Sequence, residues 1–340
     1  MESRFDGPER RLCGLIWLLP DQKYLWTRFY DVVFLDTTSR TNKYNMVACF
    51  FVVIDNCNRS RLVASALLED EAEDSFIWTL KMINKCTGDL IPQVIFTDSD
   101  LAIASAIRSE FPISVHCLCL FHIDLNIKKN LRNKLNSSEF MEFRKDFFIC
   151  RNTLVAELFE SHWEALKSKY VLAESYIKRQ LDPSKTKWAV CYINKQFTAG
   201  ANSTQRVENL NRKIHSCVGS NSSLLELVKE IQDLLDKESD FMRLEEYKDE
   251  IPMVGLATIP KTFFNSIEAT ISRYLMPVIV FKICKQMQEC FFYDCIRISN
   301  IDLESILQEP LDTDYSEGMR EDNWACTNYR SLETSNVWWD

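Results

Sequence analysis

Glycine and long apolar runs are scarce in this sequence. Only 7 of its 340 residues are glycine, and the longer polar stretches keep a regular hydrophobic spacing, so neither low complexity nor a long flexible linker is indicated. Residues 1–11 are polar and charged, which argues against a signal peptide. The apolar run from Leu12 to Leu19 is too short to span a bilayer. We therefore expect a soluble intracellular protein that makes no membrane contact.

The sequence also lacks any CxxC pair, although it contains 13 cysteines. This argues against a four-cysteine zinc site, and the cysteine spacing is not that of a small disulfide-bonded scaffold. Most cysteines lie inside apolar segments, so we expect reduced thiols packed as small hydrophobic side chains. With 46% hydrophobic and 26% charged residues, the composition indicates a globular protein of one large domain or two smaller ones.

The net charge of −9 is unevenly distributed along the chain. Residues 124–195 carry 14 Lys/Arg against 9 Asp/Glu, whereas residues 296–340 carry 3 against 10. The basic segment could contact DNA phosphates or form a solvated helical face, and both interpretations remain open. The acidic tail is expected to be poorly ordered or to bind a partner.

From residue 30 onward, β-branched and aromatic runs alternate with helical patterns. Three strand-like runs predict an antiparallel meander because short polar segments join them: Asp31–Asp36, Met46–Ile54 and Arg61–Leu68. A helix from Asp74 or Ser75, a strand over Val94–Phe96, a helix over Leu101–Ile107 and a strand over Ser114–Leu120 follow. This order, βββαβαβ, with one carboxylate ending the first strand and another ending the fourth, predicts an α/β fold: an RNase H-like core with a mixed five-stranded sheet.

The same patterns divide the chain into six parts. These are a lead-in at 1–29, the first part of the RNase H-like core at 30–125, a large helical insertion at 126–200, a helix bearing Glu208 and the helix after it at 201–250, a helical C-terminal part at 251–295, and the acidic tail at 296–340. The helices expected after the insertion are Gln205–Val218, Leu224–Glu246 and a group from Pro260 to about Cys295.

Several short blocks resemble the transposase domain of Mutator-like elements (MULE), with the far-red-impaired-response group as the most similar branch. The blocks are Asp36–Met46, Ala66–Glu71 with Ser75–Trp78, Thr97–Ala102, Phe111–Pro112 with His116–His122, and Ser203–Asn209. They follow the order of the family over roughly residues 12–295, which chance does not explain.

The resemblance implies a catalytic, metal-binding triad made of Asp36, Asp98 and Glu208. Three carboxylates suit Mg²⁺ or Mn²⁺, and a pair of such ions can activate the nucleophile and stabilise the leaving oxygen in DNA cleavage and strand transfer. Each residue also has a plain structural alternative. Asp98 could cap the following helix, with Asp100 competing for either role, Asp36 could be a turn residue, and Glu208 could be a solvated helical side chain.

Other residues in the blocks are candidates for supporting roles. Cys119 and His122 match the CxxH motif of the family, for which we expect a structural or DNA-proximal role rather than zinc binding, because a structural zinc site needs four ligands. The candidate DNA contacts are Arg206, Lys128, Lys129 and Arg132.

Longer members of the family carry an N-terminal zinc-dependent DNA-binding module and a C-terminal SWIM zinc finger, and this sequence contains neither pattern. We therefore expect a partner chain, or a homo-oligomer, to assist in sequence-specific DNA binding. Three hypotheses follow. The chain is a transposase core, intact or remnant, that acts on terminal inverted repeats, or a domesticated regulator that uses the core as a scaffold at promoter sites, or a decayed element copy without activity. The resemblance implies a nuclear location.

Overall fold

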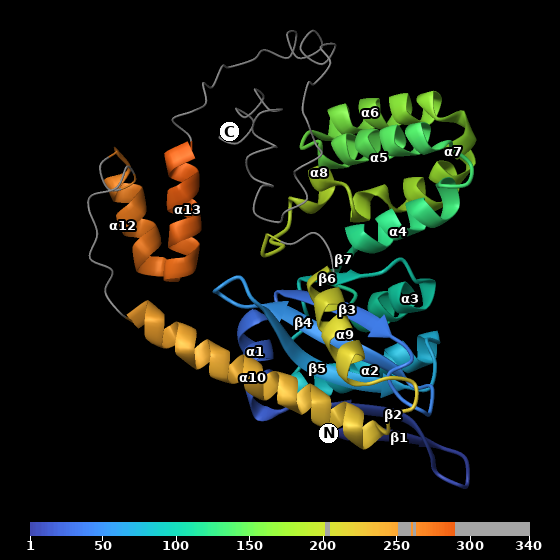
Figure 1. Ribbon diagram of the computed structural model, residues 1–340, viewed down its shortest axis with the longest axis vertical. Coiled ribbons are helices and arrows are strands. Elements are labelled where there is room, and N and C mark those ends of the chain that lie inside the picture. The colour runs from blue at the N-terminus through green and yellow to red at the C-terminus, as the bar shows by residue number, and fades with distance from the viewer. Residues whose placement is uncertain (201–204, 251–259, 261–262, 290–340) are drawn as a thin grey trace. The chain divides into compact units, whose positions relative to one another are not determined.

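The computed structural model describes residues 1–200, 205–250, 260 and 263–289 (Figure 1). At 205, 206, 208, 240–250 and 289 it describes the backbone alone. The chain forms two compact units, 1–250 and 251–340, which are treated separately below. The predicted acidic tail at 296–340 lies outside the described residues. Within the described part, no helix combines the length and the apolar character needed to traverse a bilayer.

A mixed sheet of seven strands forms the centre of the first unit. In spatial order the strands are β1 (Glu2–Asp6), β2 (Arg11–Trp17), β5 (Ser60–Leu68), β4 (Val47–Ile54), β3 (Val32–Thr38), β6 (Val94–Thr97) and β7 (Val115–Leu118). Strands β3, β4 and β5 form the predicted antiparallel meander. Strand β6 runs parallel to both β3 and β7.

The prediction of a five-stranded sheet is wrong by two strands. The segment expected to be a lead-in contains β1 and β2, and β2 pairs antiparallel with β5, Gly14 opposite Leu68 and Trp17 opposite Ser65. The apolar run after residue 11 forms a strand because it pairs with the edge of β5 that β4 leaves free. Because that edge lies about fifty residues further along the chain, a local pattern could not indicate the pairing.

Helices cover both faces of the sheet. Helices α1 (Pro20–Phe29), α2 (Glu73–Thr87) and α3 (Leu101–Glu110) pack against the face that carries Val33 and Leu35. Helices α9 (Gln205–Cys217) and α10 (Leu224–Glu250) pack against the opposite face, which carries Phe34 and Phe96. The rings of Phe34 and Phe96 stack with their centroids 5.0 Å apart. Successive residues of a strand point to opposite faces, which explains why the central strand β4 is apolar and buried along its whole length.

The insertion has a hydrophobic core of its own. It comprises α4 (Leu120–Leu131), α5 (Ser137–Asn152), α6 (Ala156–Lys169), α7 (Val171–Tyr176), the π-helical turn η1 (Ile177–Leu181), the 3₁₀ segment η2 (Asp182–Lys187) and α8 (Val190–Ile193). Aromatic rings dominate this core, among them Phe147, Phe159, Trp163 and Trp188. Arg151 is buried among them and donates from Nε to the carbonyl of Trp188. Burial lowers the pKa of this guanidinium to about 10.

The described part of the second unit consists of two helices, α12 (Asn265–Tyr274) and α13 (Pro277–Glu289). Both fall inside the segment predicted to be helical. A single turn break at Leu275–Met276 separates them, and the proline that begins α13 suits the first helical position because it has no N–H to leave unpaired.

Gly14 is expected to tolerate no larger residue, because a Cβ there would lie 2.7 Å from Cζ3 of Trp78 on α2. We expect Gly14→Ala to lower the free energy of unfolding by about 1–3 kcal/mol, measured by urea titration. Gly219→Ala is the matched control, since no atom lies within 4 Å of its added Cβ. Trp78→Leu should restore part of the loss in the double variant. Unchanged stability of Gly14→Ala alone would contradict the close contact.

Candidate functional site

Two of the predicted carboxylates lie at neighbouring strand ends. Strand β3 pairs in parallel with β6 so that Phe34 is opposite Phe96, and Asp36 and Asp98 each follow two residues later. Adjacent strands are about 4.8 Å apart, and residues two apart in a strand point to the same face. Asp36 and Asp98 therefore lie at the same edge of the sheet, and Asp36, two residues after Phe34, points to the face covered by α9.

Helix α9 is fixed over the end of β3 by two polar contacts. The side chain of Asp36 is only 4% exposed, and its Oδ2 accepts a hydrogen bond from Nδ2 of Asn211 at 2.9 Å. One turn further along α9, Nε2 of His215 lies 2.7 Å from Oγ1 of Thr38. The Oδ1 atom of Asn211 is buried and has no hydrogen-bond partner within the described residues. The carboxylate of Asp36 and the amide oxygen of Asn211 are therefore buried close to each other.

Glu208 lies in the first turn of α9, but its side chain is outside the described residues, as is that of Arg206. Positions 208, 211 and 215 follow the spacing that aligns residues along one helical face. Position 208 therefore belongs to the row whose other members contact β3. Its role as the third member of the triad stays a prediction.

The structure separates the roles of the two aspartates that follow β6. Asp100 is the N-cap of α3, because its Oδ1 accepts from the backbone N–H groups of Ala102 and Ile103. Asp98 does not cap the helix; it accepts a hydrogen bond from the N–H of Asp100 at 3.1 Å. The alternative interpretation of Asp98 as the helix cap is therefore wrong, and its second carboxylate oxygen is not needed for capping.

Burial raises the pKa of the Asp98 carboxyl above its usual value. The negative charges of Asp100 and Glu71 raise this pKa further, while the hydrogen bond from Asp100 and the charge of His122 lower it. Glu71 approaches the same strand end, where its Oε1 accepts from Oγ1 of Thr37 at 2.7 Å. Glu71 was not predicted as a site residue, although it ends one of the recognised sequence blocks.

A buried asparagine shapes the loop that follows Asp36. The Oδ1 atom of Asn42 accepts from the N–H groups of Tyr44 and Met46, both at 3.1 Å, and its Nδ2 donates to the carbonyl of Met46 at 2.7 Å. Asn42 is fully buried, so these bonds replace those it would make with water. This explains the polar residues in the first sequence block, a role that the pattern alone did not indicate.

The CxxH pair lies at the start of α4, beside the Asp98 end of the sheet. Cys119 occupies the N-cap position of α4, and its N–H donates to the carbonyl of Thr97 at 2.7 Å. His122 lies in the first turn, close enough to Asp98 for its charge to affect the pKa of that carboxyl. Among the described residues, no group of three or more His, Cys, Asp or Glu side chains is arranged to hold a metal ion.

A chain of hydrogen bonds connects the insertion to Asp98 through His116. Nζ of Lys187 donates to Nδ1 of His116 at 3.3 Å, so the ring proton belongs on Nε2, which lies 2.8 Å from Oγ1 of Thr97. The hydroxyl of Thr97 in turn donates to the carbonyl of Asp98 at 2.7 Å. Burial and the charges of Lys187 and Arg108 lower the pKa of His116 to about 3, so the ring is neutral near pH 7.

The neutral state of His116 predicts a loss of stability in acid. Below the unfolded pKa of about 6.5 the unfolded chain binds a proton that the folded chain does not, so stability falls as the pH drops from about 6.5 towards 3, by at most about 1.4 kcal/mol per pH unit from this residue. His116→Gln should flatten this dependence when the free energy of unfolding is measured at pH 7 and pH 4.5. An identical pH dependence in both proteins would exclude a buried neutral His116.

The candidate DNA contacts on α4 differ in their surroundings. Nζ of Lys128 lies 2.6 Å from Asp124, which also accepts two hydrogen bonds from the guanidinium of Arg144 at 2.8 and 2.9 Å. Lys128 thus belongs to an internal ion-pair network. Lys129 and Arg132 are exposed at the end of the same helix. They are the better placed of these residues to meet a phosphate.

Comparisons with known proteins show which proteins this sequence is similar to. Residues 32–126 match the family described as the MULE transposase domain, a range that contains Asp36, Asp98, Cys119 and His122. Three relatives from Arabidopsis thaliana are similar over a longer part of the chain. Putative protein FAR1-RELATED SEQUENCE 10 is 31% identical over 187 residues, 55% of this chain and 27% of the relative.

Protein FAR-RED IMPAIRED RESPONSE 1 is 24% identical over 237 residues, which are 68% of this chain and 28% of the relative. Protein FAR1-RELATED SEQUENCE 5 is 28% identical over 235 residues, 68% of this chain and 29% of the relative. The chain therefore spans less than a third of the length of these three proteins.

Proposed function

We propose, from the similarity to the MULE transposase domain and to FAR-RED IMPAIRED RESPONSE 1, that this chain is a DDE-type transposase core that binds DNA and cleaves and transfers its strands. The observation that supports the proposal is the register of β3 and β6, which ends both strands at one edge of the sheet, together with the contact of α9 with Asp36 there. The succession β3-β4-β5-α2-β6-α3-β7, with the first strand in the middle of the sheet, supports an RNase H-like core.

The donor set at this strand end fits Mg²⁺ or Mn²⁺. Both ions prefer oxygen ligands, and carboxylates at adjacent strand ends supply them without a competing thiolate. Burial and two neighbouring negative charges disfavour the ionised form of Asp98, a cost that a bound cation would offset. Asp36, Asp98 and Glu208 would hold the metal, which when bound supplies activation of a water or 3′-hydroxyl and stabilisation of the leaving oxygen.

The surrounding residues would keep this site in place. Asn211 orients the carboxylate of Asp36 through its amide. The chain of hydrogen bonds from Lys187 through His116 and Thr97 fixes the backbone at Asp98. Such supporting partners determine the direction in which ligand oxygens point. The exposed Lys129 and Arg132, with Arg206 on α9, would draw the DNA backbone towards the strand end.

The direct test is incubation of the full chain with Mg²⁺ or Mn²⁺ and DNA that carries terminal inverted repeats. Strand cleavage that requires the metal and stops with a chelator is the expected result. A heterologous duplex without the repeats is the control for sequence preference. Absence of both cleavage and salt-dependent binding to any DNA would contradict the proposal.

A second candidate function is a nuclear regulator that retains the core as a DNA-binding scaffold without cleavage. The similarity to FAR-RED IMPAIRED RESPONSE 1 and its related sequences favours it. A partner chain, or a second copy of this chain, would then contribute the sequence-specific recognition. The discriminating measurement is a chromatin-binding map of the tagged chain: enrichment at promoters supports regulation, whereas enrichment confined to element termini supports transposition.

A further inference from the structure

A cleft of about 190 Å³ opens between the end of the sheet and the insertion. Ser99 lines it from the sheet side, directly after Asp98, and Ile123 lines it directly after His122. The remaining lining residues come from β7, α4, α7 and the η1–η2 segment: Leu118, Asn126, Asn130, Tyr176, Gln180, Leu181 and Ser184. The cleft is thus the immediate neighbour of the candidate site, although none of the predicted site residues lines it.

The lining is polar but carries no charged side chain. Asn126 uses Nδ2 to donate to Oγ of Ser99 at 3.2 Å, and Asn130 uses Nδ2 to donate to the carbonyl of Asn126 at 2.8 Å. The side-chain carbonyl oxygens of Asn126 and Asn130 can still accept hydrogen bonds. The exposed side chain of Gln180 adds an amide that can both donate and accept. The cleft therefore presents neutral donors and acceptors above the apolar side chains of Leu118 and Ile123.

Tyr176 adds an unpaired polar group to the wall. Its side chain is only 2% exposed, and its hydroxyl makes no hydrogen bond within the part of the chain that the structure describes. Burial raises the pKa of this hydroxyl to about 12, so it stays protonated and can donate. Because Tyr176 lines the cleft, this hydroxyl can donate to an acceptor atom of a ligand there.

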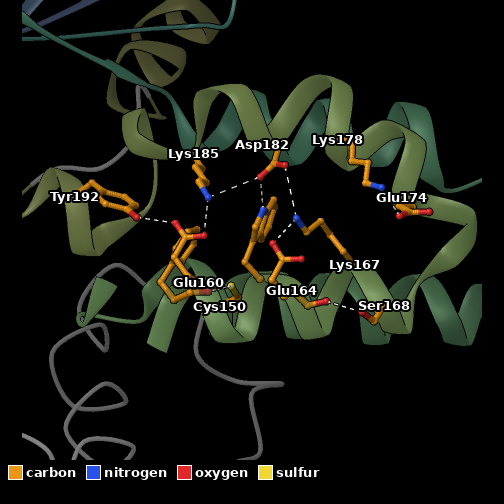
Figure 2. Close-up of polar contacts among 12 residues, drawn as sticks. Cys150, Glu160, Glu164, Lys167, Ser168, Glu174, Lys178, Asp182, Lys185 and Tyr192 are labelled. Carbon is orange, nitrogen blue, oxygen red and sulfur yellow. Dashed lines mark hydrogen bonds and ion pairs between the residues drawn. The ribbon is translucent and has the colours of Figure 1, made fainter. Parts of the chain in front are cut away.

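Ion pairs fix the wall that carries Gln180 and Ser184. Figure 2 shows Asp182 and Lys185 of η2 facing the charged side chains of α6. Nζ of Lys185 lies 2.6 Å from Glu160, and the carboxylate of Asp182 accepts from Nε1 of Trp163 at 2.7 Å. The backbone next to them is π-helical at Ile177–Leu181, a rare conformation that is frequent at functional sites. The wall is therefore held in place before any ligand arrives.

We propose that this cleft accepts one unstacked nucleobase of the DNA strand whose phosphate reaches Asp98. The inference rests on the proposed DNA function and specifies how its site holds the strand. An anion is disfavoured, because no cation lines the cleft and Asp98 adjoins it. A base fits, because it is neutral and planar, its edge pairs with asparagine and glutamine amides, and its ring can lie on apolar side chains. Lys129 and Arg179 are exposed and directly precede the lining residues Asn130 and Gln180 in sequence, so they could contact the phosphates on either side of the base.

The test measures how the full chain binds fluorescent single-stranded oligonucleotides in which one nucleotide at a time is made abasic. We expect one abasic position to weaken binding by on the order of tenfold, the loss of one well-matched base contact. Gln180→Ala and Tyr176→Phe should each weaken binding of the intact strand and leave binding of the abasic strand unchanged. The difference in affinity between the two strands should therefore disappear. Gln93→Ala, the same exchange at an exposed glutamine before β6, should preserve it.

Lys129→Ala is the control for phosphate contacts: it should weaken intact and abasic strands equally and reduce the salt dependence. Salt-dependent binding with no abasic position that matters would overturn the cleft as a base site and leave the proposed function intact. The base site is equally overturned if Gln180→Ala and Tyr176→Phe keep the full abasic effect. If the chain binds no DNA at low salt, both the cleft proposal and the proposed function fail.

Discussion

Asp98→Asn is expected to reduce metal-dependent DNA cleavage by at least about 100-fold and to raise the thermal stability of the protein. The loss of cleavage follows because a neutral amide is a much weaker ligand for a divalent cation than a carboxylate, and even supporting residues of metal sites change activity by about 10–100-fold. The gain in stability follows from the pKa of Asp98, which burial raises in the folded state. The two effects have opposite signs, so misfolding cannot imitate them.

The pH dependence gives this prediction a second measurement. A carboxyl whose folded pKa exceeds its unfolded pKa makes the folded state less stable as the pH rises through that interval. The stabilisation by Asp98→Asn should therefore be full near pH 8 and vanish in acid, where Asp98 is protonated in both states. Thermal unfolding at several pH values measures it.

Asp100→Asn is the matched control, because it is the same exchange two residues away. Asparagine caps helices as well as aspartate does, so α3 should be preserved and cleavage retained. Cleavage at the wild-type rate by Asp98→Asn would remove this residue from the site. A lower melting temperature at pH 8 would contradict the raised pKa of its carboxyl.

Trp163→Ala is expected to cost about 3–5 kcal/mol of the free energy of unfolding of the insertion. The side chain is fully buried, its ring stacks on Phe159 with centroids 5.8 Å apart, and its Nε1 donates to Asp182. Truncation would leave a cavity in the aromatic core and remove the indole N–H donor of the Asp182 carboxylate. Urea titration followed by circular dichroism measures the loss.

Trp163→Phe separates the two contributions, since it keeps an aromatic ring and removes only the N–H group and some volume. Its effect should lie between those of wild type and alanine. Phe197→Ala is the control for loss of an aromatic ring: this side chain is 67% exposed, and we expect a change within about 0.5 kcal/mol. A cost below about 1 kcal/mol for Trp163→Ala would contradict the packing of α6 against η2.

Much of the secondary structure could be predicted because it depends on local pattern. The strands expected at Met46–Ile54 and Arg61–Leu68 are present with ends shifted by a single residue. The helix expected from Asp74 or Ser75 begins at Glu73. In each case the hydrophobic spacing and the turn residues belong to the element itself, so no distant contact is needed to define it.

The hydrogen-bond partners in the candidate site were harder to predict from the sequence. Both Asp98 and Asp100 precede a helix at plausible capping distances, and only the hydrogen bonds in the folded structure assign the cap to Asp100. Asn211 was not anticipated as a partner of Asp36, although its spacing from Glu208 was a usable signal. Buried asparagines such as Asn42 look like surface turn residues in a sequence, because burial depends on what packs over them.

The sequence by itself determined the types of element and their order from β3 to β7, since residue type and spacing are local properties. The candidate acids Asp36, Asp98 and Glu208 came from the resemblance to a known family. The tertiary structure decided that β1 and β2 widen the sheet, that α9 crosses the end of β3, and that the insertion walls a cleft beside Asp98. These features depend on residues far apart in the chain: Asp36 and Asn211 are separated by 175 positions. Only folding brings such side chains within hydrogen-bonding distance.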